Sequence, residues 1–342
     1  MSESDPVLIT AIIPTFRRPD RLKKAIQSVL DQSYAFLQVC VYDNASGDET
    51  ARIVSEFTKV DSRVKYYCHP RNIGAAENFQ FGLLRVDTPF FSFLSDDDFL
   101  LPEFYATALQ GFKEYPDAAF FSGAVIDITE KGEVVDIILS KWPQQQYYVP
   151  PHGLLEMIGK YSNWAGTLFR GEVIKKNGGI DVQLKAIDID YVLRAAAHLP
   201  FTISKKHCAV FVQHSTSYSK NNGLKLIWPG WPVMISKIKE NPFLSAETKK
   251  LAEQKLHCEL QSLLLMNALR SLEEKQFDAA SSIAAIFNQV ITQKWKGYLL
   301  SAVVECSKVF PAFTKLLGGM MALRRFLLRR NKQSVFQKSM GF

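Results

Sequence analysis

Three adjacent carboxylates, Asp96, Asp97 and Asp98, interrupt an apolar stretch that has FFSFL before them and FLLP after them. Neighbouring carboxylates repel one another, and apolar surroundings raise their pKa values and disfavour ionisation. A cation is therefore expected beside them. Carboxylates at positions i and i+2 beyond a strand end both reach one divalent ion, and oxygen ligands favour Mg²⁺ or Mn²⁺. This spacing makes Asp98 and Asp96 the first-choice metal ligands, with Asp97 close behind.

A metal held by few protein oxygens completes its coordination shell with water and phosphate oxygens. The acidic cluster, residues 96–98, therefore implies a diphosphate ligand as well. The alternative is a solvated turn in which Asp98 or Ser95 caps the next helix. Taken alone, the cluster favours neither interpretation.

Two further polar loops carry groups that suit a nucleotide. Asp43 and Asn44 follow the apolar run VCVY and are able to hydrogen-bond the edge of a base or a ribose. Arg71 and Asn72 precede a turn at Gly74 and place a forked donor where it reaches phosphate or base. The alternative for Arg71 is an ordinary surface arginine.

The elements that position these residues alternate between strand and helix. Helical patterns, such as the apolar spacing from Leu22 to Leu30, separate β-rich runs at 7–13, 37–42, 64–68, 90–94 and 118–126. This rhythm predicts parallel βαβ units and a doubly wound open α/β sheet. Ligands of such sheets bind beyond the carboxyl ends of the strands, where all of these polar loops are expected to lie together.

The rhythm changes after Asp127. The stretch 140–151 is predicted to be a loop or lid near the cleft, followed by a strand, a helix from about 171 to 176 that stops at Gly178 and Gly179, and a helix in DIDYVLRAAAH. From about residue 224 onward the pattern is helical, most strongly over 246–272. We place a domain boundary near residue 222, between a catalytic domain (1–222) and a helical region (223–342).

Composition limits the class of protein. The chain has 342 residues, 47% of them hydrophobic, and a formal net charge of +7 that fits an anionic partner. Ten Lys or Arg residues against one acid lie from Lys294 to the last residue. Five widely spaced cysteines indicate reduced thiols in a cytoplasmic compartment. We expect neither a signal peptide nor a membrane-spanning helix.

The ordered set AIIPTFRRPDRLKKAIQSVLDQSY, VYDNASGDET, RNIGAAENFQFGL and FLSDDDFLLP resembles the inverting family 2 glycosyltransferases of the GT-A fold, from about Val7 to His214. The resemblance implies a Rossmann-like, mostly parallel sheet and a nucleotide-diphosphate-sugar donor, with UDP or another nucleoside diphosphate. It implies donor contacts from Pro14, Thr15, Phe16, Arg18, Asp43, Asn44, Arg71, Asn72, Gly74, Asn78, Asp96 and Asp97. Many relatives have D-A-D-D at the acidic cluster, where this chain begins with Ser95.

The resemblance also assigns the second carboxylate segment, LKAIDIDYVLRAA. Relatives often show E-D-x-D-x-x-x-R there, which makes Asp188 the general base that takes the acceptor proton, with Asp190 as a supporting acid and Arg194 as the later arginine. Ile187 replaces the usual Glu. The alternative for Asp188 is a helix cap, a role compatible with catalysis.

Three more roles follow from the resemblance. Trp164 would stack on an acceptor sugar and Gly166 would allow close backbone approach, with a buried core Trp as the equal alternative. Asp190 and Arg194 belong to the same acceptor side. His214 would approach the metal or the diphosphate, as a third metal-site residue beside Asp98 and Asp96.

The basic, apolar tail suits an amphipathic helix at an anionic membrane surface, at the inner face of the cytoplasmic membrane. A helix docked on the catalytic domain or on a partner in a homodimer is the alternative. No recognition motif for nucleic acid is present.

The sequence therefore predicts a metal-dependent, inverting, hexosyltransferase-type glycosyltransferase that uses Mn²⁺ or Mg²⁺ and a saccharide or lipid-linked saccharide acceptor in cell-surface polysaccharide or lipopolysaccharide synthesis. The alternatives are a non-catalytic module that binds a nucleotide or glycan, and a nucleotidyltransferase. The latter would have a Gly-rich, basic signature after the first strand, which PTFRRPDR lacks. A glycosidase is disfavoured, because its two carboxylates would flank a glycosidic bond.

Overall fold

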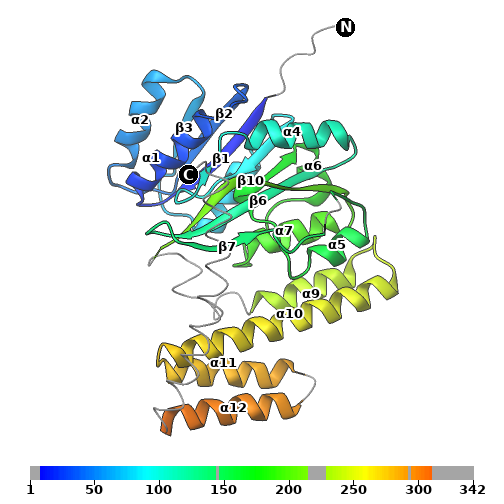
Figure 1. Cartoon of the computed structure of the whole chain (residues 1–342). Helices are drawn as coiled ribbons and strands as arrows, with labels where there is room; N and C mark the ends of the chain where they lie inside the picture. The colour runs from blue at the N-terminus through cyan, green and yellow to red at the C-terminus, as the bar shows by residue number, and fades with distance from the viewer. Residues whose placement is uncertain (1–7, 144–145, 215–228, 292–293, 310–342) are drawn as a thin grey trace. The chain divides into compact units, whose positions relative to one another are not determined.

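The computed structural model describes residues 8–143, 146–214, 229–291 and 294–309. The chain forms two compact units, residues 1–214 and 215–342, which are described separately below (Figure 1). The predicted domain boundary near residue 222 lies outside the described residues and stays a prediction.

The first unit begins with parallel strands joined by helices, as predicted. β1 pairs in parallel with β2 on one side and β4 on the other, and β2 pairs in parallel with β3. The elements in this part are β1 (Ile9–Thr15), α1 (Pro19–Leu30), β2 (Leu37–Asp43), α2 (Thr50–Val60), β3 (Val64–Cys68), α3 (Ala75–Leu83) and β4 (Phe90–Phe93). The βαβ interpretation of this half is confirmed.

The sheet becomes mixed beyond β4. Its order is β3-β2-β1-β4-β9-β6-β10-β5, and β9 lies antiparallel between β4 and β6. β7 pairs with β6, and β8 pairs with β10. The elements here are β5 (Phe99–Leu100), α4 (Phe104–Glu114), β6 (Phe120–Thr129), β7 (Val134–Ile138), β8 (Tyr147–Tyr148), α5 (His152–Met157), the 3₁₀ turn η1 (Trp164–Gly166), β9 (Thr167–Arg170), α6 (Glu172–Asn177), α7 (Ile187–Ala196) and β10 (Phe201–Gln213).

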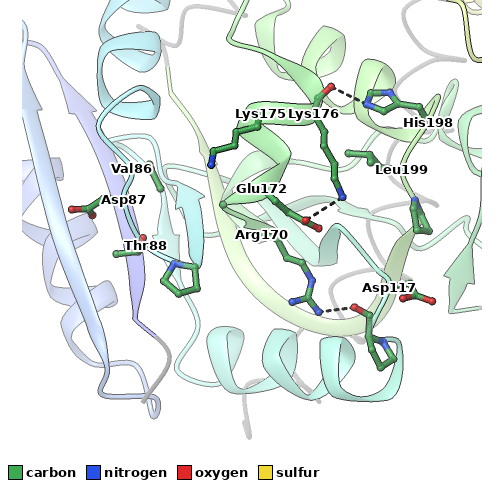
Figure 2. A pocket seen from close by; sticks show the side chains of 14 residues that line it. Val86, Asp87, Thr88, Asp117, Arg170, Glu172, Lys175, Lys176, His198 and Leu199 are labelled. Atoms are coloured by element: carbon green, nitrogen blue, oxygen red, sulfur yellow. Dashed lines mark hydrogen bonds and ion pairs between the residues drawn. The ribbon is translucent and has the colours of Figure 1, made fainter. Parts of the chain in front are cut away.

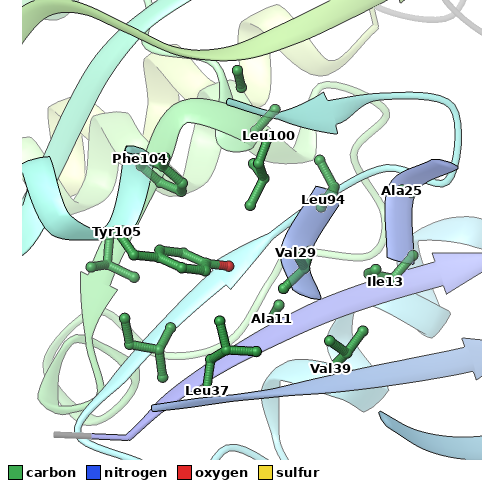
Figure 3. Packing of buried hydrophobic residues seen from close by; sticks show 14 of the residues in the cluster. Ala11, Ile13, Ala25, Val29, Leu37, Val39, Leu94, Leu100, Phe104 and Tyr105 are labelled. Atoms are coloured by element: carbon green, nitrogen blue, oxygen red, sulfur yellow. The ribbon is translucent and has the colours of Figure 1, made fainter. Parts of the chain in front are cut away.

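Helices cover both faces of the central strands, which explains why those strands are apolar nearly throughout. On one face, side chains of β1 and β2 such as Ala11 and Val39 form a buried cluster with α1, α2 and α4 (Figure 3). On the other face, α3 comes so close that a Cβ at Gly82 would lie 2.6 Å from Ile12 Cγ2. α7 covers the same face through Tyr191, whose ring meets the edge of Phe169.

The stretch 140–151, predicted to be a loop or lid near the cleft, packs elsewhere. β8 pairs with the first residues of β10, so it lies at the amino-terminal ends of the parallel strands, away from the cleft at their carboxyl ends. Trp142 is buried and meets the rings of Tyr148 and Phe201 edge-on. The lid interpretation is wrong for the described residues of this stretch, because its aromatic side chains belong to the core.

The second unit is helical, as predicted. Its described helices are α9 (Gly230–Glu240), α10 (Ala246–Glu273), α11 (Phe277–Val290) and α12 (Lys294–Val309). α10 packs on α9 and α11, and α12 packs on α11. Ser245 caps α10 by accepting a hydrogen bond from Thr248 N, and buried residues recur every fourth position from Ala252 to Ala268.

In the described part of the chain, no helix has the length and apolar character needed to cross a bilayer. The tail predicted to bind a membrane, residues 310–342, lies outside the described residues.

Candidate functional site

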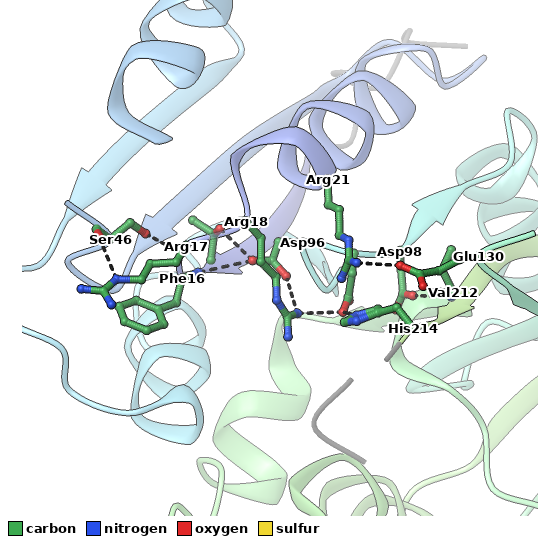
Figure 4. Close-up of polar contacts among 12 residues, drawn as sticks. Phe16, Arg17, Arg18, Arg21, Ser46, Asp96, Asp98, Glu130, Val212 and His214 are labelled. Atoms are coloured by element: carbon green, nitrogen blue, oxygen red, sulfur yellow. Dashed lines mark hydrogen bonds and ion pairs between the residues drawn. The ribbon is translucent and has the colours of Figure 1, made fainter. Parts of the chain in front are cut away.

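The loops after β1 and β4 meet at the carboxyl edge of the sheet, because these two strands are parallel neighbours. Thr15 Oγ1 donates a hydrogen bond to Asp96 Oδ2 over 2.7 Å, and the backbone N–H of Phe16 donates to the same oxygen over 3.3 Å (Figure 4). Pro14 is buried at the end of β1, and the Phe16 side chain is exposed. Two loops that are about eighty residues apart in the chain thus form one surface.

Arg18 places a positive charge beside the acidic cluster, where the sequence predicted a divalent cation. Its Nη1 lies 3.1 Å from Asp96 Oδ1 and 2.7 Å from Asp97 Oδ2. The neighbouring Arg17 turns away, with a positive φ of 55°, and bonds to Ser46 in the loop after β2. One arginine therefore offsets charge in the cluster, and the other joins two loops.

The end of β10 supplies the other contacts of the cluster. His214 Nε2 lies 2.6 Å from Asp97 Oδ2, and the imidazole is buried. The backbone N–H of Val212 donates to Asp98 Oδ1 over 3.0 Å. Two residues of one extended segment thus hold two adjacent aspartates, and the predicted approach of His214 to a metal or diphosphate stays a prediction.

The cluster carries more negative charge than its surroundings easily accommodate. Burial raises the pKa of Asp96, although Arg18 opposes the shift. Burial raises the pKa of Asp98 well above its ordinary value, and Asp97 adds to this effect. Asp127, near the end of β6, contributes in the same direction. The sequence alone does not reveal this residue, because a single carboxylate near a strand end has no distinctive pattern. This electrostatic surplus suits a divalent cation.

The hydrogen bonds of Asp96, Asp97 and Asp98 indicate which of these carboxylates could hold a divalent cation. Asp96 already accepts hydrogen bonds from Thr15 and Phe16, and Asp98 accepts one from Val212. Among the described residues, no group of three or more acidic, His or Cys side chains is arranged as a complete metal site. A metal with one or two protein ligands and several outside ligands fits, and Asp97 with His214 provides an oxygen and a nitrogen next to each other.

Asp43 lies at the end of β2 beside this surface, but both oxygens of its carboxylate already accept hydrogen bonds from within the protein. Oδ1 accepts hydrogen bonds from the backbone N–H and the hydroxyl of Ser46, and Oδ2 accepts one from the Tyr66 hydroxyl over 2.6 Å. Burial and the adjacent carboxylate raise the pKa of Tyr66, which keeps this phenol a donor. The predicted base contact of Asp43 stays a prediction.

Asn44 and Asn72 join the loops after β2 and β3. Asn44 Nδ2 donates to Asn72 Oδ1 over 3.0 Å, and Asn44 Oδ1 accepts the N–H of Ile73 over 2.8 Å. Gly74 has a φ of 99°, which favours glycine, and begins the turn into α3. Arg71 is exposed in this loop. The predicted nucleotide loops therefore do lie together, with Arg71 directed to solvent.

Asn78 has a structural role that the sequence did not reveal. Its Nδ2 donates to the backbone oxygen of Tyr42 over 2.8 Å, and its Oδ1 lies 2.9 Å from His69 Nε2. The residue is almost fully buried. These contacts explain Asn78 as a bridge between the ends of β2 and β3, and they do not favour the predicted nucleotide contact.

Asp188 lies in the first turn of α7, where it is half-buried. Burial raises its pKa, while backbone N–H groups at the start of the helix, including that of Ile189, oppose the shift. A raised pKa is a common property of carboxylates that act as general acids or bases. The helix-start alternative and the catalytic role are therefore compatible in this position.

Asp190 and Arg194 hold α7 in place. Arg194 Nε lies 2.9 Å from Asp190 Oδ2, and Arg194 also donates to the backbone oxygens of Asn177 and Gly179 at the end of α6. Asp190 is almost fully buried. This network gives the pair a positioning role for the helix that carries Asp188, and it does not favour the predicted acceptor contacts.

Trp164 belongs to the core, which is the alternative that the sequence left open. Its ring stacks on Phe93 at 4.2 Å between centroids and meets Tyr191 edge-on. A Cβ at Gly166 would lie 2.8 Å from the backbone oxygen of Gly123. The close approach at this glycine is therefore to β6. Neither contact favours the predicted acceptor role.

A large cavity of about 1040 Å³ lies at another place on the first unit. It is lined by residues before β6 and β10 and at the start of α6, including Asp117, Leu199 and Glu172 (Figure 2). Arg170 is tied to the backbone oxygens of Pro116 and Ala118 there. This cavity lies at the amino-terminal ends of the parallel strands, whereas the acidic cluster lies at their carboxyl ends. It is therefore separate from the candidate site.

Comparison with solved structures identifies the fold. Residues 1–349 of S. aureus TarS in complex with UDP-GlcNAc superpose with a TM-score of 0.62 and 14% identity, covering 92% of this chain and 91% of that chain. The mannosyltransferase PcManGT from Pyrobaculum calidifontis, in complex with GDP-Man and Mn²⁺, gives a TM-score of 0.51 and 14% identity over 96% and 87% of the two chains. The first unit therefore has a GT-A fold.

The sequence comparisons point to one family. Residues 10–159 match the model of glycosyl transferase family 2. Over 163 residues the chain is 29% identical to the GalNAc(5)-diNAcBac-PP-undecaprenol beta-1,3-glucosyltransferase of Campylobacter jejuni, covering 43% of this chain and 53% of that protein. The chain thus spans about half the length of this curated relative. Residues 10–159 are thus similar to the family 2 glycosyltransferases, and this match favours that class over the nucleotidyltransferase and non-catalytic alternatives.

Proposed function

We propose that this protein is a metal-dependent, inverting glycosyltransferase that moves a sugar from a nucleotide-diphosphate-sugar donor to a hydroxyl of a saccharide acceptor. The observation that carries the proposal is the cluster at the carboxyl edge of the sheet, where Arg18, Asp97 and His214 meet. It combines acidic metal ligands with a cation that suits phosphate, as a donor diphosphate requires.

Different residues would contact different parts of the donor. Asp97 and His214 would hold a Mn²⁺ or Mg²⁺ ion, which when bound neutralises charge on the departing diphosphate. Asp96 orders the loop after β1 through Thr15 and Phe16. The loops with Asp43 and Asn72 would receive the nucleoside, and Arg71 is exposed beside them. This assignment replaces the pair Asp96 and Asp98 with Asp97 as the principal carboxylate ligand.

Asp188 would accept the proton of the acceptor hydroxyl as that oxygen attacks the anomeric carbon. Its raised pKa makes the carboxylate a better proton acceptor than an ordinary surface aspartate. Asp190 and Arg194 would keep the first turn of α7 in position. The base and the leaving group act on opposite sides of the sugar, so the transfer inverts the anomeric configuration.

The relatives narrow the substrate class. TarS binds UDP-GlcNAc, PcManGT binds GDP-Man with Mn²⁺, and the Campylobacter relative is named for a lipid-linked saccharide acceptor. We infer a nucleoside diphosphate-hexose donor, with UDP as the first choice, and a saccharide or lipid-linked saccharide acceptor in polysaccharide synthesis at a cell surface.

The test is donor turnover. Release of nucleoside diphosphate from a panel of UDP-hexoses and GDP-hexoses is measured with Mn²⁺ and with lipid-linked and free saccharide acceptors. Asp188→Asn should lower turnover by about 10²-fold or more while donor binding persists. Asp61→Asn, at a surface ion pair with Arg63, is the matched control and should leave turnover unchanged. Full turnover by Asp188→Asn would overturn the base assignment.

A further inference from the structure

Helix α12 has two apolar faces. Gly297, Leu300, Val304 and Ser307 are buried on the side that packs on α11. Six residues on the opposite side recur at intervals of three or four, which places them on one face of the helix. They are Trp295, Tyr298, Leu299, Ala302, Cys306 and Val309. All six are exposed. A helix that is apolar on both sides is normally covered on both sides.

The exposed side is large and aromatic. Trp295 is 62% exposed, Tyr298 73% and Leu299 57%. Single exposed apolar residues are ordinary, but a continuous stripe along four turns of one helix marks a surface that binds something. We call these six residues the outer face of α12.

The residues at its borders indicate the partner. Lys294, Lys296 and Lys308 belong to the same helix, and Glu305 is its single acid. The chain that continues from Val309, residues 310–342, contains seven Lys or Arg and no acid. Trp and Tyr are the residues enriched at lipid–water interfaces, and clusters of basic residues bind anionic headgroups. The aromatic residues would also suit a second protein surface, but lysines are depleted at such surfaces, so the basic residues are the feature that favours lipid.

We propose that the outer face of α12 is a docking surface for an anionic lipid bilayer. The helix would lie in the plane of the interface, with Trp295, Tyr298 and Leu299 among the upper acyl chains. The stems of Lys294 and Lys296 would extend along the apolar surface and place their ammonium groups at the phosphates. The inference concerns the second unit alone and does not depend on sugar transfer.

Fluorescence of Trp295 tests the contact directly. The chain has four other tryptophans, so the Trp295 signal is taken as the difference between the emission of the wild-type chain and that of Trp295→Phe. The full chain is mixed with phosphatidylcholine vesicles, or with vesicles that also contain phosphatidylglycerol, each carrying a brominated acyl chain. We expect quenching of the Trp295 signal on the anionic vesicles, weaker quenching on the neutral ones, and its reduction by added salt.

A measurement of vesicle binding provides a second test of the proposal. Co-flotation with anionic vesicles should fall by about tenfold or more in the variant Trp295→Ser/Tyr298→Ser/Leu299→Ser, because the apolar area that enters the interface is lost. Val60→Ser/Leu84→Ser is the matched control, since these residues are 83% and 62% exposed in the first unit. It should bind like the wild type.

Four results would overturn the proposal. The first is an absence of Trp295 quenching on anionic vesicles, and the second is flotation of the triple variant equal to that of the wild type. The third is self-association without lipid that the triple variant abolishes, which would assign the face to a second copy. The fourth is protection of Trp295 from a soluble quencher in the lipid-free chain, which would assign it to residues 310–342.

Discussion

Arg18 Nη1 lies 2.7 Å from Asp97 Oδ2, the same oxygen that lies 2.6 Å from His214 Nε2. One carboxylate oxygen is thus shared by a permanent cation and an imidazole. A divalent ion held by this oxygen would compete with Arg18 for it. The guanidinium would then be free to donate to a phosphate group.

Arg18→Ala should separate these two effects. Mn²⁺ alone should bind about tenfold more tightly, because the competing cation is removed, whereas a nucleoside diphosphate with Mn²⁺ should bind more weakly, because a phosphate donor is lost. Calorimetric titration of both ligands measures this. Arg17→Ala is the control for Mn²⁺ alone, since Arg17 bonds to Ser46 instead of the acids. Unchanged or weaker Mn²⁺ binding by Arg18→Ala would contradict the competition.

Asp98→Asn should stabilise the metal-free protein at neutral pH. The folded-state pKa of Asp98 is raised, so its contribution to stability is fully present below the unfolded value near 3.8 and is lost as pH rises through the folded value. The neutral amide removes this cost and still offers an oxygen to Val212 N–H. We expect a gain of about 1 kcal/mol or more in the free energy of unfolding at pH 7, shrinking as pH falls toward 4.

Urea denaturation across this pH range measures the Asp98 effect. Asp96→Asn should show no comparable gain, because it also weakens the contact with Arg18. A gain for Asp98→Asn that is independent of pH, or a loss at pH 7, would show that the buried charge is not the cause.

Trp164→Ala should act on stability. The stacked ring beside Phe93 fills core volume, and its removal should cost about 3–5 kcal/mol in the free energy of unfolding. Trp295→Ala, at a residue that is 62% exposed, should be close to neutral by the same measurement. A stable Trp164→Ala protein whose only defect is a raised KM for acceptor would instead support the acceptor role expected from the sequence.

Arg194→Leu should also destabilise, by about 3–5 kcal/mol, because it removes the guanidinium that pairs with the buried Asp190 carboxylate. Arg194→Lys should not restore the loss, since a single ammonium cannot replace the fork that reaches Asp190, Asn177 and Gly179 together. Lys176→Leu, from the exposed pair with Glu172, is the control and should be nearly neutral in thermal denaturation. Equal stability of Arg194→Leu and the control would remove the positioning role.

Much of the fold could be predicted from local pattern. The alternation of apolar runs with helical spacing defined β1 to β4 and their helices, and it placed Thr15 and Asp96 at one edge. The antiparallel insertion of β9 between β4 and β6 could not be predicted, because strand order depends on long-range pairing that leaves little trace in a single sequence. The same reason explains the wrong lid interpretation, since the partners of Tyr148 lie in β10.

The sequence indicated which residues lie near the candidate site better than it indicated which contacts they make. The acidic cluster indicated Asp97 and the family resemblance indicated His214, but spacing along the chain favoured Asp96 and Asp98 as the ligand pair. Hydrogen bonds from Thr15 and Val212 to those two carboxylates depend on the fold, as do the contacts of Asp97 with Arg18 and His214, and the ligand pair stays a prediction. Trp164 shows the same limit, because an aromatic residue that packs in the core and one that stacks on a sugar look alike in a sequence.

The most direct test of the central claim is titration calorimetry of UDP and GDP with and without Mn²⁺. The wild-type protein should bind one of these nucleotides in a Mn²⁺-dependent manner, Asp97→Asn should weaken that binding by about tenfold or more, and Asp188→Asn should bind like the wild type. Failure of the wild type to bind either nucleotide with Mn²⁺, or binding that Asp97→Asn leaves unchanged, would contradict the account.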